Sequence, residues 1–200
     1  MGFKSRLITH GLLSGTTGGL LLAIQGLFFL EKGVEAWQIG LLMGTAVVST
    51  TILELPFGAL ADLYGRIKIF RVARFVFLVA ALIAVFATSF WHLVVTMALF
   101  GLAEALKTGT IDAWAAERIN ERGESDVLQT YMAAMSSALS AGLAIGAIGG
   151  GYVPIIMPEI QSLPPTAWNM IFICILVVIH LLLTPLLFSE GEEIAKKPDD

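Results

Sequence analysis

The segment GALADLYGRIK, residues 58–68, decides the fold of this chain, because its polar part, residues 62–68, separates two long apolar stretches. Residues 37–61 carry Glu54 as their one formal charge, and residues 75–103 carry none. A helix of about 20 apolar residues crosses the roughly 30 Å hydrocarbon core of a bilayer. We therefore predict membrane-spanning helices on both sides of a polar loop that lies at the membrane surface.

The composition of the whole chain also indicates a membrane protein. Of the 200 residues, 56% are hydrophobic and 14% are charged, and the mean hydropathy is +0.83. Soluble domains carry about 25% charged residues, and a soluble core of this size cannot hide so much apolar surface. The apolar run that ends at Leu30 lacks the cleavage site of a signal peptide, so we interpret it as a retained span.

Six apolar segments are predicted, which makes this an all-α membrane protein. The charge-free stretch 75–103 would be about 43 Å long as one helix, too long for one crossing. We divide it near Trp91 and His92, which suit the membrane interface. Residues 189–200 are expected to be a cytoplasmic tail or the start of a linker. The predicted spans are residues 7–30, 37–61, 69–88, 93–116, 127–153 and 168–188.

The basic residues predict the orientation of these spans, because cytoplasmic loops carry an excess of Lys and Arg. With both termini in the cytoplasm, Lys32 alone lies outside and Lys107 lies within a span. Treating residues 75–103 as one crossing would place Arg118 and Arg122 outside. The basic residues on the cytoplasmic side are then Lys4, Arg6, Arg66, Lys68, Arg71, Arg74, Arg118, Arg122, Lys196 and Lys197.

The segment 58–68 resembles the loop motif G-x-L-x-D-x-x-G-R-x-K/R of the major facilitator superfamily, and it follows the second span, where that family places it. The preceding ELPFG, residues 54–58, resembles the E-x-P-x-G sequence of many bacterial members, so we expect a prokaryotic cytoplasmic (inner) membrane. The resemblance implies the N-terminal six-helix half of a transporter. In the family this loop is a latch between two halves. The matching residues are Gly58, Asp62, Gly65, Arg66 and Lys68.

Each motif residue also has a physical role. Gly58 permits close helix approach, and Gly65 allows a tight reversal of the chain. Asp62 at a helix end can accept backbone hydrogen bonds or pair with a cation. Arg66 and Lys68 orient the loop toward the cytoplasm. A plain basic loop would explain the cations, but it would not explain Asp62 between two correctly spaced glycines.

A glycine-rich stretch in the fifth span, GLAIGAIGGG, resembles the family's antiporter motif G-x-x-x-G-P-x-x-G-G. Ala147 stands where the family has proline, so the helix kink of that motif is not expected. Antiport is one interpretation, and ordinary packing of small residues between helices is the other. The matching glycines are Gly142, Gly146, Gly150 and Gly151.

Three charged residues lie inside the fourth predicted span: Glu104, Lys107 and Asp112. A charge at the bilayer centre costs about 2.5–3.5 kcal/mol on insertion scales, so such residues face the bundle interior or a cavity. Glu104 and Lys107 are three residues apart and can form an ion pair. The functional interpretation is a substrate or proton pathway with Glu104 or Asp112 as the protonatable group. The alternative is a structural ion pair.

Two further polar residues are candidates for the same pathway. Glu54 precedes Pro56, which frees a backbone carbonyl, so Glu54 either lines a cavity or braces this helix. Gln25 lies among glycines in the first span, which indicates either a substrate path or close helix packing. Many family members carry an arginine in the fourth span, four residues before a glycine; here Met97 precedes Gly101.

The predicted function is secondary active transport of a small solute by alternating access, with proton-coupled antiport as one form. A lone six-helix half lacks one wall of a transport path, so a second half is expected. The chain is then a truncated product, a half that dimerises, or one of two half-chains. The alternative function is a membrane protein that binds or regulates a partner without transporting anything.

An enzyme is not expected. Ser14 and His10 are the best available nucleophile and base, but no G-x-S-x-G sequence surrounds Ser14. Cys174 is the single cysteine, and no histidine–cysteine spacing indicates a metal site, so neither a metal nor another cofactor is predicted. The expected partners are the lipid bilayer, the solute, a proton and the second half, and nucleic acid is not among them.

Overall fold

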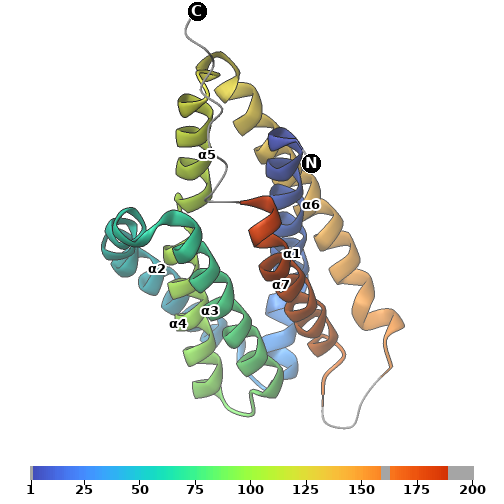
Figure 1. Cartoon of the computed structure of the whole chain (residues 1–200). Helices are drawn as coiled ribbons and strands as arrows, with labels where there is room; N and C mark the ends of the chain where they lie inside the picture. Colours follow the sequence, from blue (N-terminus) through green and yellow to red (C-terminus); the bar gives the residue numbers. More distant parts are fainter. Residues whose placement is uncertain (1, 159–162, 189–200) are drawn as a thin grey trace, which may run out of the picture.

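The computed structural model describes residues 2–158 and 163–188, and nearly all of this part of the chain is helical (Figure 1). Short loops join long helices, because apolar runs separated by a few polar residues leave little chain between crossings. The elements are α1 (Phe3–Glu31), α2 (Ala36–Tyr64), α3 (Arg66–Phe86), α4 (Phe90–Lys107), α5 (Thr110–Glu121), the 3-10 helix η1 (Ser125–Val127), α6 (Leu128–Ile156) and α7 (Ala167–Leu187).

Six helical segments are long and apolar enough to cross a membrane when α4 and α5 are counted as one. This confirms the predicted fold class, an all-α membrane protein of six transmembrane helices. The fourth segment differs from the single helix expected over residues 93–116. It is interrupted between Lys107 and Thr110, where Gly109 takes a left-handed φ of +72°.

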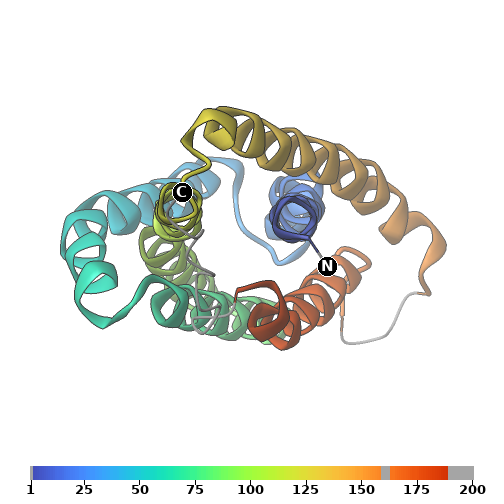
Figure 2. The same ribbon diagram turned by 45° about the horizontal axis from the view of Figure 1, so that its top comes forward.

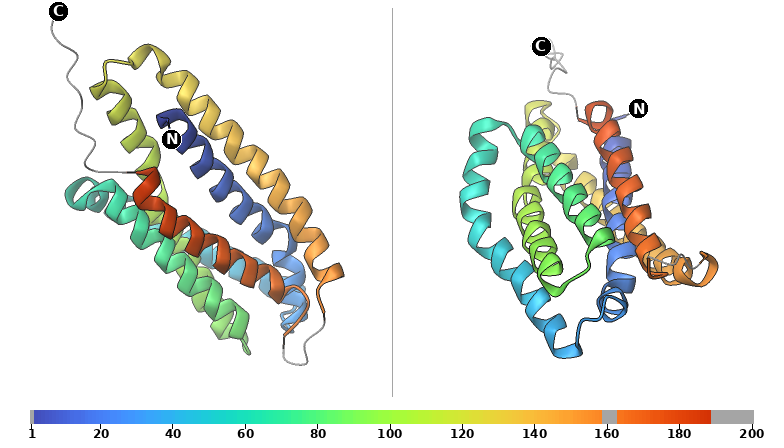
Figure 3. Two further views of the ribbon diagram at one scale, coloured as in Figure 1. Left: turned by 45° about the vertical axis from the view of Figure 1, so that its right-hand side comes forward. Right: turned by 90° about the horizontal axis from the view of Figure 1, so that it is seen from below.

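The helices form two groups of three, and each group has a central helix. α1 lies between α6 and α7, and α4 lies between α2 and α3 (Figures 2 and 3). Contacts between α3 and α7 join the groups. α2 and α6 therefore lie at the two open ends of this arrangement, and most of their large apolar side chains are exposed.

The contact between α1 and α6 is a packing of backbone against backbone. A methyl group added at Gly15 would overlap the carbonyl oxygen of Leu139, and one added at Gly146 would overlap that of Thr16. In lipid, helices associate through van der Waals packing, and small residues let their backbones approach closely. The glycine spacing in both helices therefore holds this pair together.

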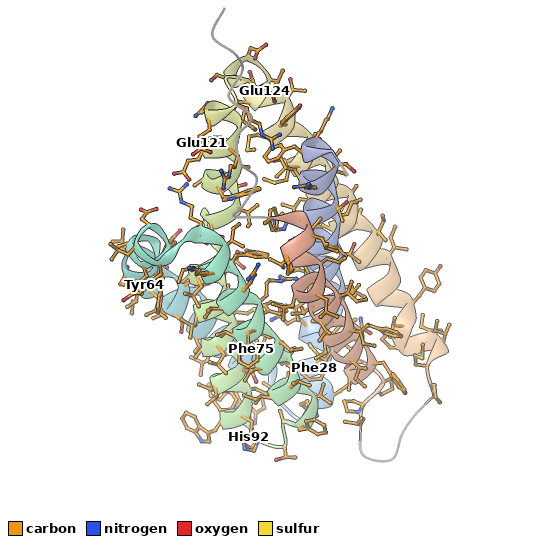
Figure 4. The ribbon with its side chains drawn as sticks, viewed as in Figure 1. Phe28, Tyr64, Phe75, His92, Glu121 and Glu124 are labelled. Atoms are coloured by element: carbon orange, nitrogen blue, oxygen red, sulfur yellow. The ribbon has the colours of Figure 1, made fainter. Side chains whose placement is uncertain are left out.

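The end of the bundle opposite the α2–α3 loop is tied by polar contacts. Lys32 Nζ donates hydrogen bonds of 2.9 Å to the carbonyl oxygens of Val85 and Ala87, at the end of α3. Burial lowers the pKa of Lys32 from its ordinary value. The hydroxyl of Thr166 donates to Glu31 Oε2. His92 lies at this end, whereas Glu121 and Glu124 lie at the other (Figure 4).

Candidate functional site

The loop between α2 and α3 is closed by one arginine that reaches two carboxylates. Gly65, with φ +95°, ends α2 and begins α3, as its predicted role in a reversal requires. Asp62 Oδ1 accepts hydrogen bonds from Arg66 Nε at 3.3 Å and Nη2 at 3.1 Å. Arg66 Nη1 lies 2.9 Å from Glu117 Oε1 on α5. Arg66 therefore links the loop to α5, the second part of the fourth span.

The other members of the loop motif make no such contacts. Around Gly58, no heavy atom of the described residues lies within 4 Å of an added Cβ. The close helix approach predicted for Gly58 is therefore not made inside this part of the chain. Lys68 and Glu54 are exposed, and Glu54 does not join the polar residues of the fourth span.

The break between α4 and α5 places the charged residues of the fourth span. Lys107 Nζ lies 2.7 Å from Glu104 Oε2, so the ion pair predicted from their spacing is present. Thr108 Oγ1 donates to the Glu104 carbonyl at 2.9 Å, and Thr110 Oγ1 donates to the Lys107 carbonyl at 2.7 Å. The Glu104 carbonyl also accepts from the backbone N–H of Thr108 at 2.9 Å, so the two hydroxyls add side-chain hydrogen bonds to the last carbonyl groups of α4.

A cavity of 300 Å³ opens at this break, between α1, α4, α5 and α6. Glu104 and Lys107 line it from α4, and Asp112 lines it from the first turn of α5. His10 and Ser14 of α1 face it from the other side. The structure thus brings three of the predicted pathway residues to one cavity, together with two residues of the first span.

Gln25 lies away from this cavity. Its Nε2 is 3.6 Å from the sulfur of Met97 on α4, the position where many family members carry arginine. A second cavity of 330 Å³ lies between α1, α2, α3 and α4, and Glu104 lines this one as well. Among the candidate pathway residues, Glu104 therefore lies where the two spaces meet.

Three buried basic side chains form a polar layer that the sequence analysis did not predict. Arg74 Nη2 lies 3.1 Å from His180 Nδ1, and His180 Nε2 lies 3.1 Å from His10 Nδ1. Two apolar clusters enclose this layer, one containing Phe28 and the other Phe70. Along each of the helices α1, α3 and α7, the buried basic residue lies between residues of one cluster and residues of the other.

Arg74 was expected among the basic residues of the cytoplasmic surface, and the structure places its side chain inside the bundle. Its side chain is 4% exposed and points into the bundle. The helical period carries a signal for this position, because Arg74 is on one stripe with the buried Ile67, Phe70 and Ala81. His180 shows the same pattern on α7, between the buried Val177 and Thr184.

Three of the four glycines of the antiporter-like stretch are packing residues in this structure. Gly142, Gly146 and Gly150 are buried, and an added Cβ at Gly150 would lie 3.1 Å from Ala23 Cβ. Gly151 meets no heavy atom of the described residues within 4 Å. The small-residue interpretation therefore accounts for three of the four glycines.

Neither a metal cluster nor a nucleophile–base pair is formed by residues 2–158 and 163–188. No three His, Cys, Asp or Glu side chains of this part gather closely enough to hold a metal ion. Ser14 and His10 line the same cavity, but Ser14 Oγ has no hydrogen-bond partner among the described residues. The arrangement can bind polar groups and hold a proton on a carboxylate.

Comparisons with known proteins agree with this architecture. The family profile described as Major Facilitator Superfamily matches residues 7–199. A protein of Escherichia coli strain UMN026, named an uncharacterized MFS-type transporter YcaD, is 26% identical over 190 residues. A protein of Enterobacter sp. strain 638, named an uncharacterized MFS-type transporter Ent638_1421, is 29% identical over 192 residues.

These alignments cover 94% of this chain and 45% of each relative. The chain therefore spans about half the length of the curated relatives it matches. The family profile covers nearly all of the chain, and the structure has six helices that can span a membrane. The chain is thus an integral multi-pass membrane protein, and it belongs to the major facilitator superfamily, a family of transporters.

Proposed function

We propose that this chain forms one six-helix half of a secondary transporter, which moves a small solute by alternating access. The 300 Å³ cavity carries the proposal, because Glu104, Lys107 and Asp112 meet there at a break in a membrane-spanning segment. In secondary transporters, interrupted helices at the interior of the bundle form the binding sites for solutes and coupling ions.

The proposed coupling ion is the proton, exchanged for the solute as in an antiporter. Glu104 is the proposed proton-binding group, since it faces both cavities and Lys107 can compensate its charge. An ionisable residue at this depth is costly, and it is usually retained for a function. Asp112, exposed on the first turn of α5, is the proposed exchange point with the cytoplasm.

A second six-helix half is the proposed partner, supplied by a second copy or by another chain. The support lies on α2 and α6, whose apolar side chains include Leu55, 85% exposed, and Ile155, 76% exposed. Gly58 and Gly151 on the same helices meet nothing in the described part of the chain, so a partner helix can approach them closely. Both termini are proposed to lie in the cytoplasm of a prokaryotic cell.

Alternating access can be tested by labelling cysteines from each side of the membrane. The background is Cys174→Ala, which removes the native buried thiol. In it, Ser136→Cys places a thiol in the cavity, and we expect a membrane-impermeant maleimide to label it in right-side-out and in inside-out vesicles. Labelling of Ser136→Cys from one side alone, in native membranes, would show that the cavity does not alternate.

Two variants in the same background control for sidedness. Trp91→Cys lies at the end of α4 that carries His92, and Glu121→Cys lies at the opposite end. We expect the first to react from the outside alone and the second from the cytoplasm alone. The reverse pattern would contradict the proposed orientation while leaving the cavity result interpretable.

A further inference from the structure

Arg74, His180 and His10 form a buried hydrogen-bonded series. The donors and acceptors of these side chains determine the direction of its hydrogen bonds. Three helices contribute to it, α3, α7 and α1, and the three side chains are 4%, 0% and 8% exposed. The Phe70 ring packs against both imidazoles, with centroids 5.3 Å from His10 and 5.5 Å from His180. The two imidazole rings are therefore enclosed in one orientation.

The direction starts at Arg74, because a guanidinium carries donors and no acceptor. His180 Nδ1, 3.1 Å from Arg74 Nη2, must accept, so the proton of the neutral His180 ring is on Nε2. His180 Nε2 then donates to His10 Nδ1, 3.1 Å away. His10 consequently carries its proton on Nε2. A second proton on either ring would set two N–H groups against each other and remove one of these two hydrogen bonds.

The last residue of this hydrogen-bonded series, His10, belongs to the lining of the cavity. His10 lines the 300 Å³ cavity, and its Nε2 has no hydrogen-bond partner among the described residues. The cavity wall at His10 therefore presents an N–H donor and not an acceptor. Ser14, one helical turn along α1, lines the same wall with a buried hydroxyl that also has no partner in this part of the chain.

Positive charge lies behind and beside this donor. Arg74 forms no ion pair within the described residues, and a small space of 20 Å³ separates it from Glu104 and Lys107. Glu104 is already paired with Lys107. Asp112, the other carboxylate on the cavity lining, is exposed on α5. Among the described residues, Arg74 is therefore the buried cation nearest the two imidazoles that has no counter-charge, which favours a negatively charged oxygen in the cavity next to His10.

We propose that the cavity binds a small solute through a carboxylate group that accepts a hydrogen bond from His10 Nε2, with Arg74 as the positioning residue that sets this tautomer. The inference rests on the proposed transport function, because it names the chemical class of the solute. Arg74 itself does not contact the solute; it acts through His180. A protonated amine of the same size has donors alone and lacks the acceptor that this wall requires.

Nitrogen NMR of the full chain in lipid nanodiscs tests the tautomers directly. With ¹⁵N-labelled histidine, we expect His10 and His180 to show a directly bonded proton on Nε2 and none on Nδ1. His92→Gln removes the exposed third histidine and simplifies the assignment. A proton on Nδ1 of His10, or a mixture of tautomers, would overturn the proposal.

Substitution of Arg74 separates positioning from folding. We expect Arg74→Gln to release His180 into a mixture of tautomers, whereas Arg74→Lys, which also has donors alone, keeps the Nε2–H form. Arg71→Gln is the matched control, since Arg71 is exposed on the same helix. If Arg74→Gln does not fold, the proposal is tested on the wild type and Arg74→Lys alone, because both must show the Nε2–H tautomer of His180.

Ligand binding is tested with propionate and with propylamine as the matched amine. We expect propionate to shift the His10 Nε2 resonance and propylamine to leave it unchanged. His10→Phe should weaken propionate binding roughly tenfold or more, the loss of one hydrogen bond to a charged group. A shift caused by propylamine, or none by propionate, would overturn the carboxylate assignment.

The two proposals can fail separately in these experiments. Propionate binding at His10 together with one-sided labelling of Ser136→Cys would leave the binding site intact and reject alternating access. Two-sided labelling together with an unresponsive His10 would leave transport intact and reject the carboxylate site.

Discussion

At the scale of single residues, Arg66 joins two carboxylates from different helices. It contacts Asp62 at 3.1 Å and Glu117 at 2.9 Å, and the two carboxylate side chains are 67% and 58% exposed. Exposed ion pairs contribute about 0–1 kcal/mol to stability. A large effect of removing one of these charges would therefore report on a functional role and not on folding.

We expect Asp62→Asn to abolish transport while insertion into the membrane and the thermal midpoint stay close to wild type. The loss is measured as one-sided labelling of Ser136→Cys in the same background. Glu117→Gln is the comparison, since it removes the other carboxylate of Arg66. Two-sided labelling that persists in Asp62→Asn would reject the role of this loop as a latch.

Glu104 is the residue on which proton coupling depends in the proposed function. We expect Glu104→Gln to leave exchange of a bound solute intact and to remove its response to a pH gradient, because the amide cannot take up a proton. Solute uptake into vesicles is measured with and without the gradient. Glu121→Gln is the control, since Glu121 is an exposed carboxylate of α5 that does not line the cavity, and coupling that survives in Glu104→Gln would remove Glu104 from the mechanism.

At the scale of elements, α1 and α6 touch through glycine backbones and leave no room for side chains. Gly146→Ala would bring its methyl group onto the carbonyl oxygen of Thr16, so the two helices must separate. Overpacking of this kind costs about 1–3 kcal/mol. We expect a lower thermal midpoint for Gly146→Ala in nanodiscs than for the wild type.

Gly149→Ala is the matched control on the same helix. No heavy atom of the described residues lies within 4 Å of a Cβ added at Gly149, and alanine is the better helix former. We expect its midpoint to equal or exceed that of the wild type. Equal destabilisation by the two variants would mean that packing between α1 and α6 is not the cause.

At the scale of the whole molecule, the exposed apolar faces of α2 and α6 lie at the two ends of the helix arrangement. The proposed second half covers them and closes the cavity on its open side. Lipid tails are as apolar as these side chains, so a folded monomer can also exist in a bilayer. Association is therefore decided by packing and not by exposure alone.

Native mass spectrometry of the purified chain in nanodiscs measures this association. We expect a dimer if a second copy supplies the other half, and Gly58→Leu should reduce the dimer fraction because Gly58 is then at the contact. Gly26→Leu on α1, also without near neighbours in the described residues, is the control. A monomer for the wild type would contradict self-association and leave a separate chain as the partner.

The sequence by itself determined the six spans, the chain reversal within residues 58–68 and the ion pair between Glu104 and Lys107. The polar loop expected over residues 62–68 is shorter in the structure, where Gly65 alone joins α2 to α3. Each depends on distances along the chain: about 20 apolar residues to cross a bilayer, and a spacing of three residues to align side chains on a helix. The family followed from the same loop, because its glycines and charges stand at set intervals.

Only the tertiary structure decided which polar residues meet. His180 is 106 residues from Arg74 and 170 from His10 along the chain, so their hydrogen bonds exist because α1, α3 and α7 pack together. The break at Gly109 and the exposed position of Glu54 also depend on how neighbouring helices fit. Hydropathy records whether a residue enters the membrane, and packing alone determines which side chain it faces there.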